Sequence, residues 1–280
     1  MKDKLIIKKN VLADRFSLIL APLIMLVMVY LPNTGAAVIA SKLFDETSDI
    51  ALQVYLILAP VIAFIVLLIF ERWFYPEYKS CITLKGVGYG LLLCIPVAVF
   101  WCVWWGIQVG AGFKEVVPLA AEDTLKGVRP GITEEISFRA IAVVLLLRRY
   151  REKKTILIPV LVTSVFVGLI HMTNLTGAED IHEVVGTLVQ SCFAIVFGLI
   201  IAVVFILFGS LWPSVILHSA YDTLCFCIID VKTSPDWPVF VSVAGVAVIA
   251  AAMLVYLMKK QERAEMLLNI RWKNDGIKID

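Results

Sequence analysis

The chain has 280 residues, of which 60% are hydrophobic and 17% are charged, and its net charge at pH 7 is +2. Soluble domains use roughly 45–50% apolar residues, so this composition excludes an ordinary soluble domain and indicates a membrane protein with several spans. The basic residues lie beside the apolar runs, where membrane topology accounts for them, so we expect membrane lipids and no nucleic acid among the partners.

A helix needs about 20 apolar residues to cross the hydrocarbon core of a bilayer, and by that measure the chain has eight spans. We see no internal repeat, and therefore predict an all-α fold: a polytopic membrane helix bundle of about eight transmembrane helices. Residues 1–258 would form a single bundle domain, followed by a basic cytoplasmic tail at 259–280. The predicted spans are about 16–40, 50–70, 86–110, 131–149, 155–175, 184–208, 210–229 and 238–258.

The distribution of Lys and Arg predicts the orientation of this bundle. With both termini in the cytoplasm, the cytoplasmic segments carry 19 of these residues and the outer loops carry five. Such an excess on the cytoplasmic side is typical of membrane proteins. We therefore expect cytoplasmic N and C termini in the cell (plasma) membrane, with a tail that either lies along the inner leaflet as an amphipathic helix or is solvated.

The six cysteines have no spacing that is typical of a zinc ribbon. Cys81 is expected in a cytoplasmic loop, and the other five are interpreted as small buried hydrophobic residues. These five lie within the apolar runs and are Cys94, Cys102, Cys192, Cys225 and Cys227.

The first group of ionisable residues in an apolar run is in the stretch "GITEEISFRA", residues 131–140. Ionisable side chains within spans are costly and suggest function. Glu135 and Arg139 are four residues apart and can form an ion pair on one helix face. Glu134 lies about 140° around the helix from Arg139 and is free to point elsewhere. Thr133 is predicted to be the N-cap of this helix. The alternative for the whole group is an ordinary salt-bridged helix end at the water surface.

Two histidines follow in later spans. His171 has Asn174 three residues on, and a hydrogen-bonded structural role is the alternative for it. His218 and Asp222 are four residues apart and share a helix face, so that the carboxylate could orient the imidazole. From a helix rise of 1.5 Å per residue, His218 would lie roughly 10–15 Å deeper than Glu134, so convergence requires helix tilt or a late start of the seventh helix.

These residues resemble the CPBP intramembrane proteases, which include the type II CAAX prenyl endopeptidases. The motifs of that family are Glu-Glu-x-x-x-Arg, a Phe followed by a His, and His-x-x-x-Asn, and the resemblance places a protease-like core at about 130–225. There are two departures: Phe166 is five residues before His171, with Val167 in the usual place, and Asp222 stands where Asn is common. The matching residues are Glu134, Glu135, Arg139, Phe166, His171, His218 and Asp222.

The resemblance implies an endopeptidase that hydrolyses a peptide or lipid-anchored protein substrate within or beside the membrane. Glu134 would activate water as a base, His171 would help to hold that water, and His218 with Asp222 would stabilise the oxyanion. Arg139 would fix Glu135 and the shape of the site. The implied catalytic residues are Glu134, Glu135, Arg139, His171, His218 and Asp222.

Two mechanisms remain open at this point. Glu134, His171 and His218 could bind a single divalent metal such as zinc and leave one position for water. The family also has a metal-free mechanism based on glutamate, which we favour, so that no cofactor would be required.

Two other functions compete with the peptidase. One is a non-catalytic immunity or regulatory membrane protein on the same scaffold. The other is a proton-coupled transporter, in which the intramembrane charges would form a relay, although we see no repeated halves of the kind that many transporters have. His182 is interpreted as part of a solvated outer loop.

Overall fold

In the computed structural model, the described backbone covers residues 2–74, 82, 84, 87–150, 156–231 and 237–259. The loop that contains Cys81 and the predicted tail beyond Lys259 lie outside the described residues. The elements in chain order are α1 (Lys2–Leu43), α2 (Asp49–Phe74), α3 (Val87–Gly110), β1 (Lys114–Val116), α4 (Ala121–Glu135), the π-helix η1 (Ile136–Val143), α5 (Val144–Tyr150), α6 (Leu157–His171), the 3₁₀-helix η2 (Met172–Gly177), α7 (Ile181–Phe208), α8 (Trp212–Phe226), β2 (Ile228–Asp230) and α9 (Trp237–Lys259).

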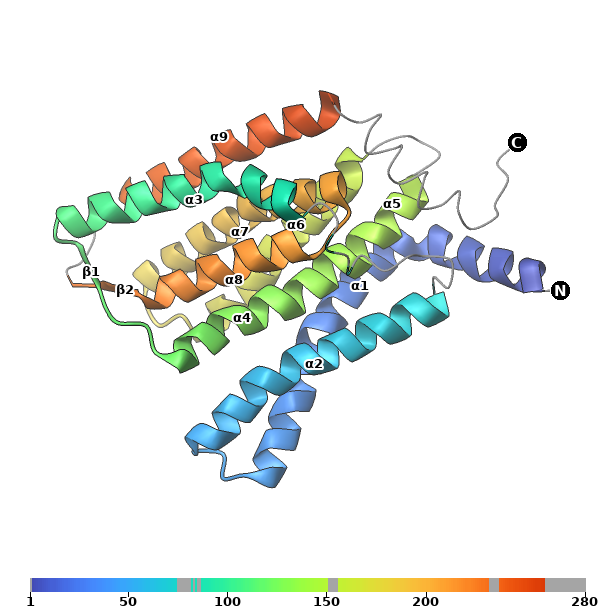
Figure 1. The fold of residues 1–280 in the computed structure, drawn as a ribbon, viewed down its shortest axis with the longest axis horizontal. Helices are drawn as coiled ribbons and strands as arrows, with labels where there is room; N and C mark the ends of the chain where they lie inside the picture. Colours follow the sequence, from blue (N-terminus) through green and yellow to red (C-terminus); the bar gives the residue numbers. More distant parts are fainter. Residues whose placement is uncertain are drawn as a thin grey trace.

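The chain is an integral membrane protein. In its described part, six helices are long and apolar enough to cross a membrane, and each corresponds to a predicted span. The start of α1 and the end of α9 lie toward the same end of the bundle (Figure 1), whereas the turns α1–α2, α3–α4 and α6–α7 lie at the other end. The six candidate spans are Ile19–Leu43, Asp49–Arg72, Val87–Gly110, Leu157–Gly177, Ile181–Phe208 and Phe240–Lys259.

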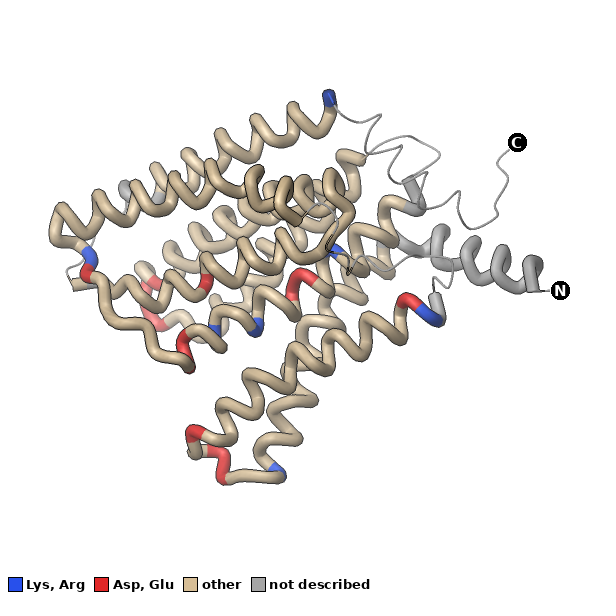
Figure 2. The backbone as a smooth tube through the Cα atoms, in the orientation of Figure 1, with Lys and Arg blue, Asp and Glu red and all other residues tan. Residues whose placement is uncertain are grey.

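The two remaining predicted spans, 131–149 and 210–229, are helical but are not among these six. The run α4–η1–α5 is interrupted by the π-helix and carries charged side chains in its middle. Figure 2 shows these charges, whereas α3 carries none and α9 carries one only at its end, Lys259. Helix α8 has 15 residues and is therefore about 22 Å long, which is shorter than the hydrocarbon core of roughly 30 Å.

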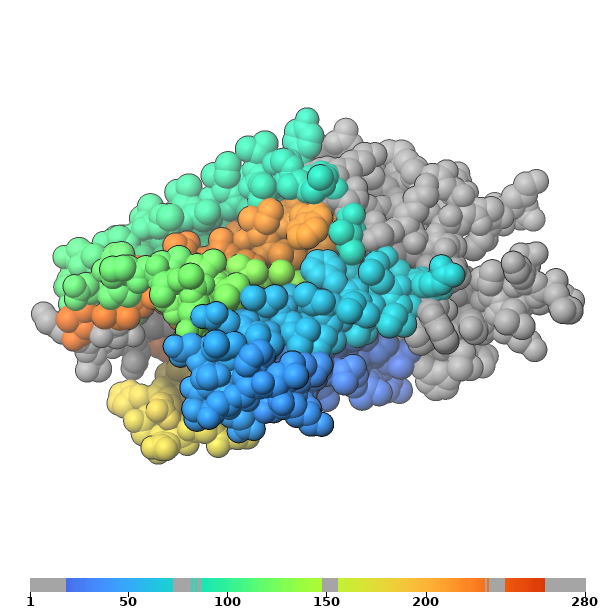
Figure 3. Space-filling model, turned by 60° about the horizontal axis from the view of Figure 1, so that its bottom comes forward, coloured from blue at the N-terminus to red at the C-terminus, as the bar shows by residue number. Residues whose placement is uncertain are grey.

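Helices α4 and α8 lie side by side in the middle of the bundle, between the α3–α9 pair and the α1–α2 pair (Figure 1). The second half of α7 and the whole of η1 are buried there. In the space-filling view, the α1–α2 pair lies against α4, part of which stays visible beside it (Figure 3). The residues of η1 therefore face protein on all sides.

Two small features differ from the sequence predictions. An antiparallel pair of three-residue strands, β1 and β2, joins the ends of α3 and α8 in a fold that is otherwise all-helical, with Lys114 opposite Asp230. Of the five described cysteines, only Cys94 is buried, and Cys102, Cys192 and Cys225 lie on the outer surface. The prediction that these three are buried in protein was wrong, because an apolar helix surface that faces lipid does not need protein to cover it.

Candidate active site

The helix that carries the glutamate pair begins ten residues earlier than predicted. Helix α4 starts at Ala121, so Pro130 and Thr133 lie inside it. Thr133 does not cap the helix; its hydroxyl donates to the carbonyl oxygen of Arg129, 2.9 Å away. Glu134 is therefore in the last turn of α4 and His218 is midway along α8. The expected difference in depth between them disappears because of the early helix start.

Two glycines allow α4 to approach α8 closely. A Cβ on Gly131 would lie 2.8 Å from the backbone nitrogen of Ser219, and a Cβ on Gly127 would lie 2.7 Å from the Cα of Thr223. Small residues four apart let two helix backbones meet in this way. The contact sets the spacing between Glu135, one turn after Gly131, and the neighbouring α8.

Glu135 is the centre of the charged cluster. Its Oε1 lies 2.8 Å from Nδ1 of His218, and its Oε2 lies 3.3 Å from Nε of Arg139. The Glu135 and Arg139 side chains are 0% and 1% exposed, so water contributes nothing to their solvation. Arg139 also donates from Nη2 to the carbonyl oxygen of Gly198 on α7, 3.3 Å away. The predicted Glu135–Arg139 pair is present, and His218 shares it.

Glu134 and Asp222 approach the other nitrogen of the same imidazole. Nε2 of His218 lies 3.5 Å from Oδ2 of Asp222 and 4.0 Å from Oε2 of Glu134. The adjacent glutamates therefore face opposite ring nitrogens, and the carboxylate that orients His218 through a hydrogen bond is Glu135, with Asp222 farther away. The Asp222 side chain is 26% exposed and that of Glu134 is 17% exposed, so this side of the ring is the accessible one.

Within the described residues, the side chain of His171 makes no hydrogen bond and no ion pair, and it interacts electrostatically with His218. Asn174, which was expected on the same side, donates to Gln190 Oε1, 3.2 Å away. Phe166 packs with Val167 in a separate apolar cluster between α1, α6 and η1.

Aromatic residues from α3, α7 and α8 form the apolar wall beside His218. The ring of Phe197 meets the imidazole edge to face at 5.8 Å. Tyr221 packs against Trp101 with tilted rings at 4.3 Å and stacks on Phe193 at 5.1 Å. Sequence reasoning missed this wall, because its members come from three helices. It also missed the Gly127–Gly131 contact, although their spacing of four residues is a recognisable signal.

The donor set does not fit a bound metal. Among the described residues, no three His, Cys, Asp or Glu side chains are grouped so that they could hold one ion. Nδ1 of His218 is already directed at Glu135, and His171 stands apart. We therefore derive no step through a metal.

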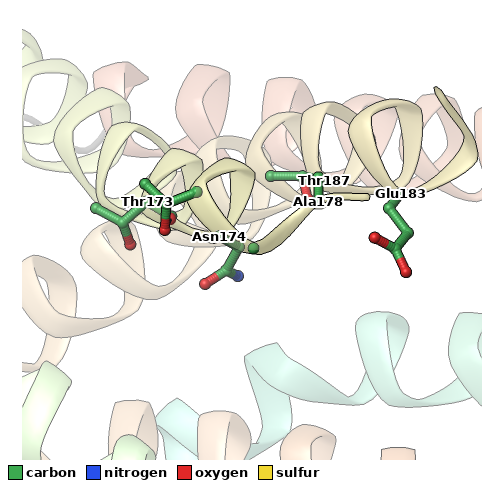
Figure 4. A pocket seen from close by; sticks show the side chains of 7 residues that line it. Thr173, Asn174, Ala178, Glu183 and Thr187 are labelled. Carbon is green, nitrogen blue, oxygen red and sulfur yellow. The ribbon is translucent and has the colours of Figure 1, made fainter. Parts of the chain in front are cut away.

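Two pockets are lined by residues of η2, α7, α8 and α9, and none of the six candidate residues lines either of them. A polar one of about 540 Å³ lies at η2 and the start of α7, where Asn174 and Glu183 point to the same side (Figure 4). Another of about 260 Å³ is lined by residues of α7, α8 and α9, including Phe193 and Tyr221. His182 lines the second pocket and lies in the first turn of α7, so the prediction that it is a loop residue was wrong. The side chain of Asp180 accepts a hydrogen bond from the backbone N–H of Glu183, and this N-cap stabilises the start of α7 at Ile181.

Residues 124–224 match the family model of Type II CAAX prenyl endopeptidase Rce1-like proteins. This segment belongs to the CPBP intramembrane protease family. The match covers about a third of the chain and includes all six candidate site residues. No curated protein and no solved structure matches the chain. The CPBP segment coincides with the helices that bring Glu135 and His218 together.

Replacing Gly127 by Ala should destabilise the CPBP segment. The added Cβ would meet the backbone of Thr223, which cannot move aside as a flexible side chain could, and overpacking costs roughly 1–3 kcal/mol. We expect a lower thermal unfolding temperature of the purified protein in lipid nanodiscs. Gly106→Ala in α3 is the matched control, because nothing lies within 4 Å of its added Cβ. Equal unfolding temperatures for the two variants would contradict this account.

Replacing Arg139 by Gln should be strongly destabilising, because the buried Glu135 carboxylate loses its guanidinium partner. Breaking a buried pair on one side costs about 3–5 kcal/mol. The Glu135→Gln and Arg139→Gln double variant should lose less stability than the two single variants combined. Lys126→Gln, which breaks the surface pair with Glu122, should change stability little, because water screens an exposed pair. Additive effects in this double-mutant cycle would show that the pair is not coupled.

Proposed function

We propose that the chain is an intramembrane endopeptidase that hydrolyses a peptide bond of a membrane-associated protein or peptide. The observation that carries this proposal is the gathering of Glu134, Asp222 and His218 Nε2 on one partly accessible side of a buried charged cluster. Membership of the CPBP segment in a family of endopeptidases supports it. The function stated here rests on that arrangement together with the family.

In the proposed reaction, Glu134 is the base that activates water. Oε2 of Glu134 and Nε2 of His218 are 4.0 Å apart, too far for a direct hydrogen bond but close enough for one water to bridge. Glu134 would take a proton from that water while the water oxygen attacks the carbonyl carbon of the peptide bond. The tetrahedral intermediate would then collapse with cleavage of the C–N bond, and Glu134 would return the proton to the leaving amine.

His218 would stabilise the negative charge that develops on the carbonyl oxygen. Its Nδ1 is directed at Glu135, which fixes the plane of the ring and leaves Nε2 facing Glu134. An imidazolium held in this way can donate from Nε2 to the oxyanion. Arg139 would keep Glu135 in place, and His171 would contribute to water binding from α6 without touching the cluster directly.

The surroundings of the site are consistent with a substrate that is anchored in the membrane. The aromatic wall connects Phe197, beside His218, to Phe193 and Tyr221, and these last two line the pocket of about 260 Å³ between α7 and α9. We propose that this pocket accommodates an apolar part of the substrate. We also propose that the protein resides in the cell membrane with both termini in the cytoplasm.

Glu134→Gln should abolish cleavage while leaving the membrane abundance of the protein unchanged, because the substitution keeps the size of the side chain and removes the base. Quantitative mass spectrometry of peptides in membranes and medium, comparing the wild type with Glu134→Gln, measures this and identifies the substrate. Full cleavage by the variant would remove Glu134 as the base. Uptake into proteoliposomes that depends on a proton gradient, with no peptide product, would favour a transporter.

Asp222→Asn should keep cleavage within about tenfold of the wild type, because Glu135 still accepts the hydrogen bond from Nδ1 that orients His218. His218→Gln should reduce cleavage by about 10²–10³-fold, the loss typical of a missing oxyanion donor. Initial rates on the substrate identified above measure both. A larger loss for Asp222→Asn than for His218→Gln would assign the dominant role to the carboxylate.

A further inference from the structure

Arg129 makes a polar contact between three helices close to the active-site cluster. Its Nη1 donates to the side-chain oxygen of Asn33 on α1 and to the hydroxyl of Tyr55 on α2, the latter at 2.7 Å. The guanidinium also lies over the ring of Tyr55, 5.1 Å from its centroid. All of these partners are neutral, so they orient the cation without neutralising its charge.

The charge of Arg129 has no acidic partner within ion-pair distance in the described part of the chain, and its Nε is buried without a hydrogen-bond partner. The neighbouring cations of the same helical run differ. Lys126 is paired with Glu122 at 2.6 Å, a hydrogen bond that raises the pKa of the lysine, and Arg139 is paired with Glu135. A partly buried guanidinium without an anion is costly, which points to an anion supplied from outside the chain.

The position of Arg129 connects it with the catalytic residues. It precedes Glu134 by five residues on α4, which is about 7.5 Å along the helix axis and about 140° around it, so the two side chains leave the helix in different directions. Arg129 is connected with the site through Asp222 on α8, with which it interacts electrostatically. Asp222 and Glu134 lie on the same side of the His218 ring, so a peptide held there has a group within reach of Arg129.

We propose that Arg129 binds a carboxylate group of the peptide substrate, an inference that rests on the proposed peptidase function. The planar guanidinium matches a carboxylate with two parallel hydrogen bonds. Asn33 and Tyr55 hold Nη1 and so fix the plane of the group. The carboxylate is that of the C-terminus or that of an acidic side chain, and the experiment distinguishes the two.

The test measures peptide binding by the full-length Glu134→Gln variant in lipid nanodiscs, which should bind peptides without cleaving them. The probe is a degenerate library of ten-residue, mainly apolar peptides, made once with free C-terminal carboxylates and once as C-terminal amides. Mass spectrometry of the retained peptides gives the ratio of acids to amides. We expect at least about tenfold enrichment of the acids, as for a hydrogen bond to a charged group.

Adding Arg129→Gln should bring that ratio close to one, and adding Lys126→Gln, the matched cation three residues earlier, should leave it unchanged. If Asp and Glu are enriched in both libraries and Arg129→Gln removes this enrichment, the source is a side-chain carboxylate. Equal retention of acids and amides without such enrichment overturns the proposal, and so does an acid preference that survives Arg129→Gln.

Arg129→Lys keeps the proposal testable if Arg129→Gln does not fold. Lysine retains the charge but loses the fork, so the preference for acids should fall; an unchanged preference overturns carboxylate binding by the guanidinium. A phospholipid that native mass spectrometry finds on the protein with Arg129, but not on Arg129→Gln, also overturns the proposal if no acid preference exists. Because binding is measured without cleavage, failure of this test leaves the catalytic role of Glu134 standing, and the reverse holds as well.

Discussion

The arrangement of the site depends on one buried carboxylate, that of Glu135, which contacts both Arg139 and His218. A charge with 0% exposure is tolerated only when its partners replace the lost water, so the three side chains hold one another in fixed positions. Arg139 lies on η1 and His218 on α8. The Glu135 carboxylate can contact both because Gly127 and Gly131 let α4 pack closely against α8. A structural ion pair and the imidazole that we propose to act in catalysis thus share the same carboxylate.

Periodicity and spacing predicted a substantial part of this molecule. Six of the eight predicted spans correspond to helices that can cross a membrane, because a long apolar run leaves few alternatives to a helix in lipid. The geometry of positions i and i+4 predicted the Glu135–Arg139 pair and the separate direction of Glu134. The family resemblance pointed to the same residues, and the family model matches the segment 124–224 in which they lie.

The remaining features depend on contacts between helices, which spacing along one helix cannot reveal. The hydrogen bond between Nδ1 of His218 and Glu135 joins residues 83 positions apart. The orienting carboxylate was therefore assigned from the sequence to Asp222, which is close to His218 along the chain. The start of α4 at Ala121 was missed because the predicted span began only after Pro130, whereas the structure keeps this proline inside the helix, packed against α8. Arg129 fell in the predicted loop between 110 and 131 for the same reason.

The π-helix from Ile136 to Val143 begins directly after the glutamate pair. It changes the direction around the helix axis in which the side chains of α5 point. Backbone bonds from i to i+5 wind more slowly than those of an α-helix, so a residue in α5 points in a different direction from the one that an unbroken wheel drawn from α4 would give. A face deduced for residues up to Glu135 therefore cannot be continued to Leu147. A chain with the same Glu-Glu-x-x-x-Arg motif but an unbroken α-helix would direct the side chains that correspond to α5 toward different neighbours.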